Sequence, residues 1–244
     1  MQIQKILVTT LIILSVSFLG LQILQLETQA SGLRTLLLIG LTIFYCLSIK
    51  DKSRFFYLFL LAFTLAEILN FISLFMPVVF ENGTDYFYYL ANTLYILSYL
   101  FLITKVLGDI NLKEVIRKFP IHIIVLFILD IFCVVIVTDT TKGLLTNAEY
   151  TLEFLYNTVI MLLLTVTLIN YVYREDKKSM NLLIGSIFIV FSEVIQLAYF
   201  YISAINILNV ICSFFLVMAF IFFYLQSRLM YQKNDDFNSS GLYI

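Results

Sequence analysis

The stretch LLIGSIFIVFSEVIQLAYFYI, residues 182–202, is apolar over the length that a helix needs to cross a bilayer, yet it contains one glutamate, Glu193. A helix rises 1.5 Å per residue, so about 20 residues span the roughly 30 Å of hydrocarbon. Lipid offers no partner for a free peptide N–H or C=O, so a run of this length must be helical. The stretch therefore predicts a transmembrane helix with an ionisable side chain inside it.

The composition of the whole chain agrees with a membrane protein. Of the 244 residues, 61% are hydrophobic and only 13% are charged, about half the charged fraction of a soluble domain. No basic stripe with interleaved aromatics is present, so we expect no nucleic-acid partner. With one histidine and three scattered cysteines, the sequence predicts neither a metal site nor a bound cofactor.

Seven more apolar runs of similar length occur along the chain, and they lack the alternation of barrel strands. The sequence therefore predicts an all-α membrane protein with eight transmembrane helices in one domain, residues 1–231, followed by a short polar cytoplasmic tail, residues 232–244. The predicted spans are Ile6–Leu26, Leu33–Ile49, Phe55–Phe80, Tyr86–Leu107, Phe119–Val137, Leu152–Tyr173, Leu182–Ile202 and Ile205–Met230.

The lysines and arginines predict the orientation of these spans. When the connections are assigned to alternate sides, 13 of the 15 basic residues fall on one side, and only Arg34 and Lys142 on the other. The positive-inside rule then places both termini in the cytoplasm. The first run has an apolar core of about 21 residues, longer than that of a signal peptide, so we expect it to be retained as a span. Frequent Ile, Lys, Asn and Tyr with no Trp indicate an AT-rich bacterial genome, and hence a bacterial inner membrane.

Three acids lie well inside the predicted spans, away from their ends: Glu67, Asp130 and Glu193. Such a residue costs about 2.5 to 3.5 kcal/mol near a helix centre, so it normally faces a bundle interior and indicates function. Glu67 follows Arg54 by 13 residues and Glu193 follows Lys178 by 15, which places the two glutamates about 20 and 22 Å from the cytoplasmic side. We therefore expect them at similar depth.

The surroundings of the two glutamates also match. Residues 66–71, AEILNF, read like residues 192–197, SEVIQL, at a spacing of 126 residues. The third and seventh spans run in the same direction, so this likeness predicts two parallel four-helix halves with the acids meeting at their interface.

This arrangement predicts a site built on paired carboxyl groups. Each glutamate has an amide three residues later, Asn70 or Gln196, on the same helix face. Two carboxyl groups facing each other would hold a proton between them, which supplies both an acid and a base for hydrolysis. Other residues expected to line the pocket are Tyr95, Ser98 and Tyr99 of the fourth span, and Asp130 of the fifth. The alternative is that the glutamates only hydrogen-bond neighbouring helices and hold the bundle together.

Three motifs resemble those of the YhhN-like lysoplasmalogenases, which are eight-span membrane proteins. Residues 185–193, GSIFIVFSE, are similar to a Gly, Phe and Ser-Asp stretch of that family, and residues 59–69, FLLAFTLAEIL, to its third-span aspartate motif. Residues 223–226, FYLQ, resemble an aromatic and glutamine signature in the last span. Both family aspartates are glutamate here, and Ser98 stands where the family tends to carry a histidine.

The resemblance implies hydrolysis of the vinyl ether bond of a lysoplasmalogen, giving a fatty aldehyde and a glycerophospho-headgroup. Glu67 and Glu193 would then be the catalytic pair, and a membrane lipid or lysolipid the substrate. Two other classes stay open: a proton-coupled transporter using the same acids, and a sensory or scaffold protein that keeps the fold without the chemistry.

Overall fold

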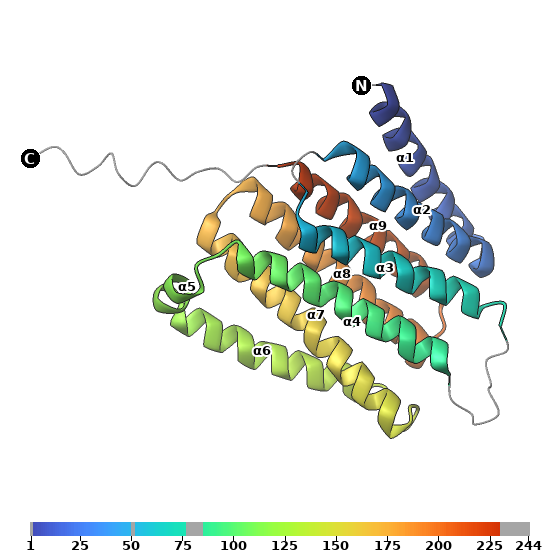
Figure 1. Ribbon diagram of the computed structural model, residues 1–244. Coiled ribbons are helices and arrows are strands. Elements are labelled where there is room, and N and C mark those ends of the chain that lie inside the picture. Colours follow the sequence, from blue (N-terminus) through green and yellow to red (C-terminus); the bar gives the residue numbers. More distant parts are fainter. Residues whose placement is uncertain (1, 50–51, 77–84, 230–244) are drawn as a thin grey trace, which may run out of the picture.

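The computed structural model describes residues 2–49, 52–76 and 85–229, which form nine helices and no strand. Figure 1 shows the long helices side by side in a bundle, with α1 at one edge and α6 at another. The helices are α1 (Gln2–Ile23), α2 (Glu27–Ser48), α3 (Arg54–Ser73), α4 (Tyr86–Gly108), α5 (Leu112–Lys118), α6 (Pro120–Asp139), α7 (Asn147–Arg174), α8 (Lys177–Tyr201) and α9 (Asn206–Arg228).

Seven helices, α2 to α4 and α6 to α9, are long and apolar enough to cross a membrane. In α1 the described apolar stretch, Leu7–Ile23, is shorter. The structure thus confirms a helical, multi-pass membrane protein. The predicted ends of the third and eighth spans, Phe80 and Met230, and the predicted tail at 232–244 lie outside the described residues.

Several helix ends differ from the predicted spans, and at the start of α7 the reason is a side-chain cap. At α7, Thr146 accepts a hydrogen bond from the backbone N–H of Glu149, whose carboxylate accepts one from the N–H of Thr146. This capping box starts the helix at Asn147, five residues before the apolar run. Likewise α2 begins at Glu27, six residues before its predicted span, and the polar connection after α4 contains α5, which hydropathy alone does not mark.

The helices pack as two serial sets. In the first, α1 contacts α2, α2 contacts α3, and α3 contacts α4; in the second, α6 to α9 contact one another in the same order. The two sets meet where α4 packs on α7 and where α1 packs on α9.

Aromatic side chains fill the centre of the bundle between α3, α4 and α9. The ring of Phe59, which is fully buried, stacks on Phe220 at 6.1 Å between centroids and meets the edge of Phe223 at 5.4 Å. Phe63, one turn further along α3, contacts the rings of Tyr95 and Tyr99 at 4.9 and 6.0 Å. The core therefore leads from this phenylalanine cluster directly to the tyrosines of the predicted site.

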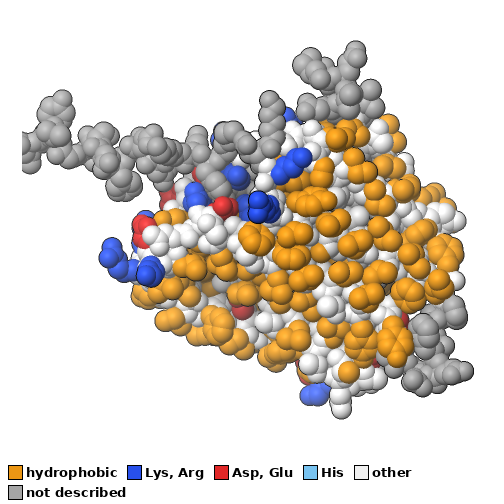
Figure 2. Space-filling model, viewed as in Figure 1, with side chains coloured by type: hydrophobic (Ala, Val, Ile, Leu, Met, Phe, Trp, Pro, Cys, Tyr) orange, Lys and Arg blue, Asp and Glu red, His pale blue; other side chains and the backbone are white. Residues whose placement is uncertain are grey.

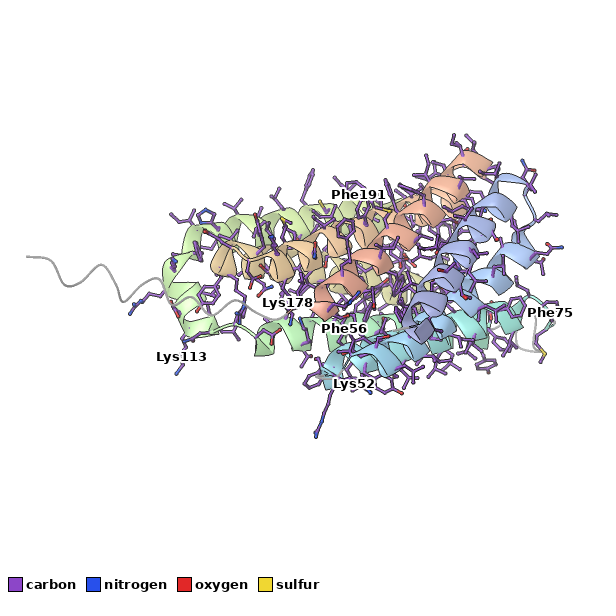
Figure 3. The ribbon with its side chains drawn as sticks, turned by 90° about the horizontal axis from the view of Figure 1, so that it is seen from above. Lys52, Phe56, Phe75, Lys113, Lys178 and Phe191 are labelled. Carbon is purple, nitrogen blue, oxygen red and sulfur yellow. The ribbon has the colours of Figure 1, made fainter. Side chains whose placement is uncertain are left out.

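The outer surface is apolar over most of its area. Figure 2 shows hydrophobic side chains over most of one face, with Lys and Arg gathered toward one end. Figure 3 shows Lys113 at one end of the bundle and Phe75 at the opposite end, and Phe191 projecting away from α8. Phe191 is 54% exposed, so one side of α8 faces outward while Ser192, next to it, is buried.

Candidate functional site

Glu67 of α3 is almost fully buried and has partners on both carboxylate oxygens. Its Oε2 lies 2.7 Å from Nε of Arg34 on α2, and its Oε1 accepts a hydrogen bond of 2.7 Å from the Tyr95 hydroxyl on α4. Asn70, one turn after Glu67, donates from Nδ2 to the same Tyr95 hydroxyl at 2.8 Å. The predicted acid and amide of this half are therefore joined through Tyr95, and an arginine balances the charge.

Glu193 of α8 has a different environment. Its Oε1 accepts a hydrogen bond of 2.5 Å from the hydroxyl of Tyr99 on α4, and the ring of Tyr156 on α7 packs against the Tyr99 ring at 6.0 Å between centroids. Glu193 is partly exposed, whereas Glu67 is 2% exposed. Among the described residues no cation forms an ion pair with Glu193.

The two glutamates belong to one cluster. Tyr95 and Tyr99 are one turn apart on α4, and the Tyr156 ring lies 6.2 and 6.0 Å from theirs, measured between centroids. Tyr95 bonds to Glu67 and Tyr99 bonds to Glu193. The two glutamates, from helices that are four spans apart, are therefore each hydrogen-bonded to one of two successive tyrosines on α4, and the Tyr156 ring packs against both tyrosines.

Three other predicted residues lie outside these contacts. The Ser98 hydroxyl is fully buried and donates to the backbone carbonyl of Tyr95 within α4. Gln196 is partly exposed and hydrogen-bonds to none of the described residues. Asp130 on α6 is partly exposed and, within the described part of the chain, hydrogen-bonds to neither glutamate. The acid and the amide three residues after it are therefore joined by hydrogen bonds at Glu67 and Asn70, but not at Glu193 and Gln196.

Sequence reasoning missed two members of the cluster, Arg34 and Tyr156. Arg34 entered the sequence reasoning only among the basic residues that orient the spans, although it is the second residue of the predicted second span, Leu33–Ile49. A cation at that position already indicated an acidic partner. Tyr156 carried no signal, because the chain has 16 tyrosines and nothing in its local sequence distinguishes it.

A second buried acid, Glu153, lies on α7 one turn before Tyr156. Its carboxylate accepts hydrogen bonds from Asn157 Nδ2 at 3.3 Å and from the Tyr88 hydroxyl at 3.4 Å. Asn157 also donates to Thr138 of α6 at 3.1 Å. These bonds tie α4, α6 and α7 together and give this acid a structural role.

The fold and the cluster define the class: a polytopic helical membrane protein with a buried network of carboxylates, tyrosines and one arginine. Among the described residues no group of three or more His, Cys, Asp or Glu side chains could hold a metal ion. Comparison of the chain with protein-family models, curated proteins and solved structures gives no match.

Proposed function

We propose that this protein is a membrane hydrolase that cleaves the vinyl ether bond of lysoplasmalogens, in line with the family that its motifs resemble. The observation that carries the proposal is the inequality of the two carboxyl groups. Glu67 has both oxygens occupied and its charge balanced by Arg34. Glu193 is partly exposed and has hydroxyl partners, so it is the carboxyl group placed to exchange a proton with a ligand.

In the proposed reaction Glu193 acts first as an acid. Its proton goes to the vinyl carbon remote from oxygen, the double bond is consumed in forming that C–H bond, and an oxocarbenium ion results. The negative charges of the new Glu193 carboxylate and of Glu67 stabilise this cation. Water then adds to the carbon bonded to oxygen and gives its proton to Glu193. The resulting hemiacetal breaks its C–O bond, releasing a fatty aldehyde and the glycerophospho-alcohol.

Glu67 takes a supporting role in this proposal. Its Oε2 is fully buried and its Oε1 is bonded to Tyr95, so it acts as a fixed charge and holds the tyrosine network in place. The sequence leaves open which glutamate is the acid and which the base, and this proposal assigns the acid to Glu193.

The same geometry supports a second candidate, a proton-coupled transporter. The serial contacts of α1–α4 and of α6–α9 fit two parallel halves, and the hydrogen bond from Tyr99 on α4 to Glu193 on α8 joins one half to the other. We infer eight spans with both termini in the cytoplasm of a bacterial inner membrane, which agrees with the basic end seen in Figure 2. A carrier would use protonation of Glu193 to move substrate rather than to break a bond.

One experiment separates these functions. Purified protein in lipid vesicles is given 1-alkenyl-lysophosphocholine, and aldehyde release is followed through an alcohol dehydrogenase and NADH. We expect release that is lost in Glu193→Gln and kept in Glu175→Gln, an exposed glutamate at the end of α7. Wild-type protein that releases no aldehyde from choline, ethanolamine or glycerol lysolipids would overturn the proposal, and uptake driven by a proton gradient would favour the transporter.

A further inference from the structure

Arg34 contacts Glu67 in a way that leaves most of its guanidinium unused. The ion pair runs from Nε to Oε2 at 2.7 Å, but the N–H is not aligned with the oxygen, so neither atom counts as hydrogen-bonded. A bidentate arginine–carboxylate pair normally uses two parallel N–H groups. Here the two terminal nitrogens hydrogen-bond to none of the described residues.

The exposure of the pair shows where those nitrogens face. The Arg34 side chain is 16% exposed and the Glu67 side chain only 3%. The terminal nitrogens have no hydrogen-bond partner among the described residues, yet unlike Nε they are not among the fully buried atoms that lack one. Part of the exposure of this side chain therefore belongs to the terminal fork.

We propose that the terminal fork of Arg34 binds the phosphate group of the lysolipid while its ether end lies at Glu193. This inference rests on the proposed function and deepens it, because it assigns the substrate class. A guanidinium presents its N–H groups in the planar geometry that phosphate oxygens accept. In a lysolipid only five covalent bonds separate the ether oxygen from phosphorus, so both groups fit within one small cluster.

The charges of the cluster are consistent with this assignment. A phosphodiester carries one negative charge, and it would enter next to Glu67, which Arg34 already balances, and Glu193, which is neutral while it holds the proton to be transferred. A neutral alkenylglycerol would leave the fork of Arg34 without a ligand. The enzyme should therefore require the phosphate and show little preference among the alcohols attached to it.

The first test compares two substrates on two proteins. For wild type we expect kcat/KM to be about 10- to 100-fold higher for 1-alkenyl-lysophosphocholine than for 1-alkenylglycerol. This is the effect expected when a substrate lacks the group that forms a charge-assisted hydrogen bond with the protein. Arg34→Lys keeps the charge beside Glu67 but removes the fork, so it should lose most of this preference, the rate on the phosphocholine substrate falling at least about tenfold more than the rate on alkenylglycerol. Arg54→Lys, at the exposed start of α3, is the matched control.

If Arg34 serves only as a counter-ion for Glu67, Arg34→Lys will lower the rates on both substrates equally, and the inference is overturned. Should this variant fail to fold, the wild-type comparison still decides, because equal rates on both substrates exclude a phosphate requirement.

The second test measures binding without hydrolysis. Calorimetry with the saturated 1-O-alkyl-lysophosphocholine should show binding that is about tenfold or more weaker in Arg34→Lys, whereas 1-O-alkylglycerol should bind both proteins alike. Glycerophosphocholine and inorganic phosphate separate a lipid site from a free-anion site, and we expect neither to compete at equal concentration. Phosphate-dependent binding without any aldehyde release would overturn the hydrolase alone. Aldehyde release without phosphate preference would overturn this inference alone.

Discussion

Replacing Arg34 by Met tests the central ion pair without assuming any activity. Met keeps much of the side-chain volume but leaves the Glu67 carboxylate, 3% exposed, without its cation. At 2.7 Å and an effective dielectric of about 20, the lost attraction is about 6 kcal/mol. Removing one partner of a buried ion pair typically costs about 3 to 5 kcal/mol, because the charge that remains is left uncompensated.

We therefore expect Arg34→Met to lower the free energy of unfolding by about 4 kcal/mol at pH 7.

The measurement is SDS-driven unfolding in mixed micelles, followed by circular dichroism in the far ultraviolet. The double variant Arg34→Met with Glu67→Gln removes both charges and keeps an acceptor for Tyr95, so it should recover to within about 1 kcal/mol of wild type. Arg54→Met, at the exposed start of α3, should change stability by less than about 0.5 kcal/mol. A loss below about 1 kcal/mol in Arg34→Met, or a double variant no more stable than it, would refute the ion-pair reasoning.

Three further changes test other parts of the structure. Tyr99→Phe removes the 2.5 Å hydrogen bond to Glu193. It should lower the free energy of unfolding by about 1 to 3 kcal/mol in the same assay and lower the rate of aldehyde release at least tenfold. A variant with wild-type turnover would show that this bond does not position the acid. Gly185→Ala places a Cβ 2.6 Å from a buried phenylalanine ring on α9 and should lower the free energy of unfolding by about 1 to 3 kcal/mol. Gly20→Ala, where the new Cβ has no atom within 4 Å, should be neutral or slightly stabilising. Equal effects of the two changes would contradict the close approach of α8 and α9. Thr146→Ala breaks the capping box of α7 and should lower stability by about 1 kcal/mol, which Thr146→Ser should restore.

The helices were the most predictable feature of this protein. A long apolar run in lipid can satisfy its backbone only as a helix, and the predicted spans therefore correspond to seven candidate membrane helices and to α1. Helix ends were predicted less well. At Thr146 the start depends on a side chain that bonds the first turn, and hydropathy averages over such single residues.

The candidate site was partly predictable. Of the predicted residues, Glu67, Asn70 and Tyr95 form one hydrogen-bonded set and Glu193 and Tyr99 another, and whether the two sets make one catalytic site stays a prediction. Glu67 and Glu193 could be identified as candidate site residues from the sequence, because an acid inside an apolar run is costly and easily recognised.

The sequence by itself determined that this chain is a helical membrane protein and that two glutamates lie deep within it, since both follow from the cost of placing polar groups in hydrocarbon. Only the tertiary structure decided that Arg34 pairs with Glu67 while Tyr99 bonds to Glu193. Those partners lie on different helices, and which helix faces meet depends on side-chain packing across the whole bundle. That packing distinguishes a buried carboxylate paired with a cation from a partly exposed carboxyl group bonded by a tyrosine.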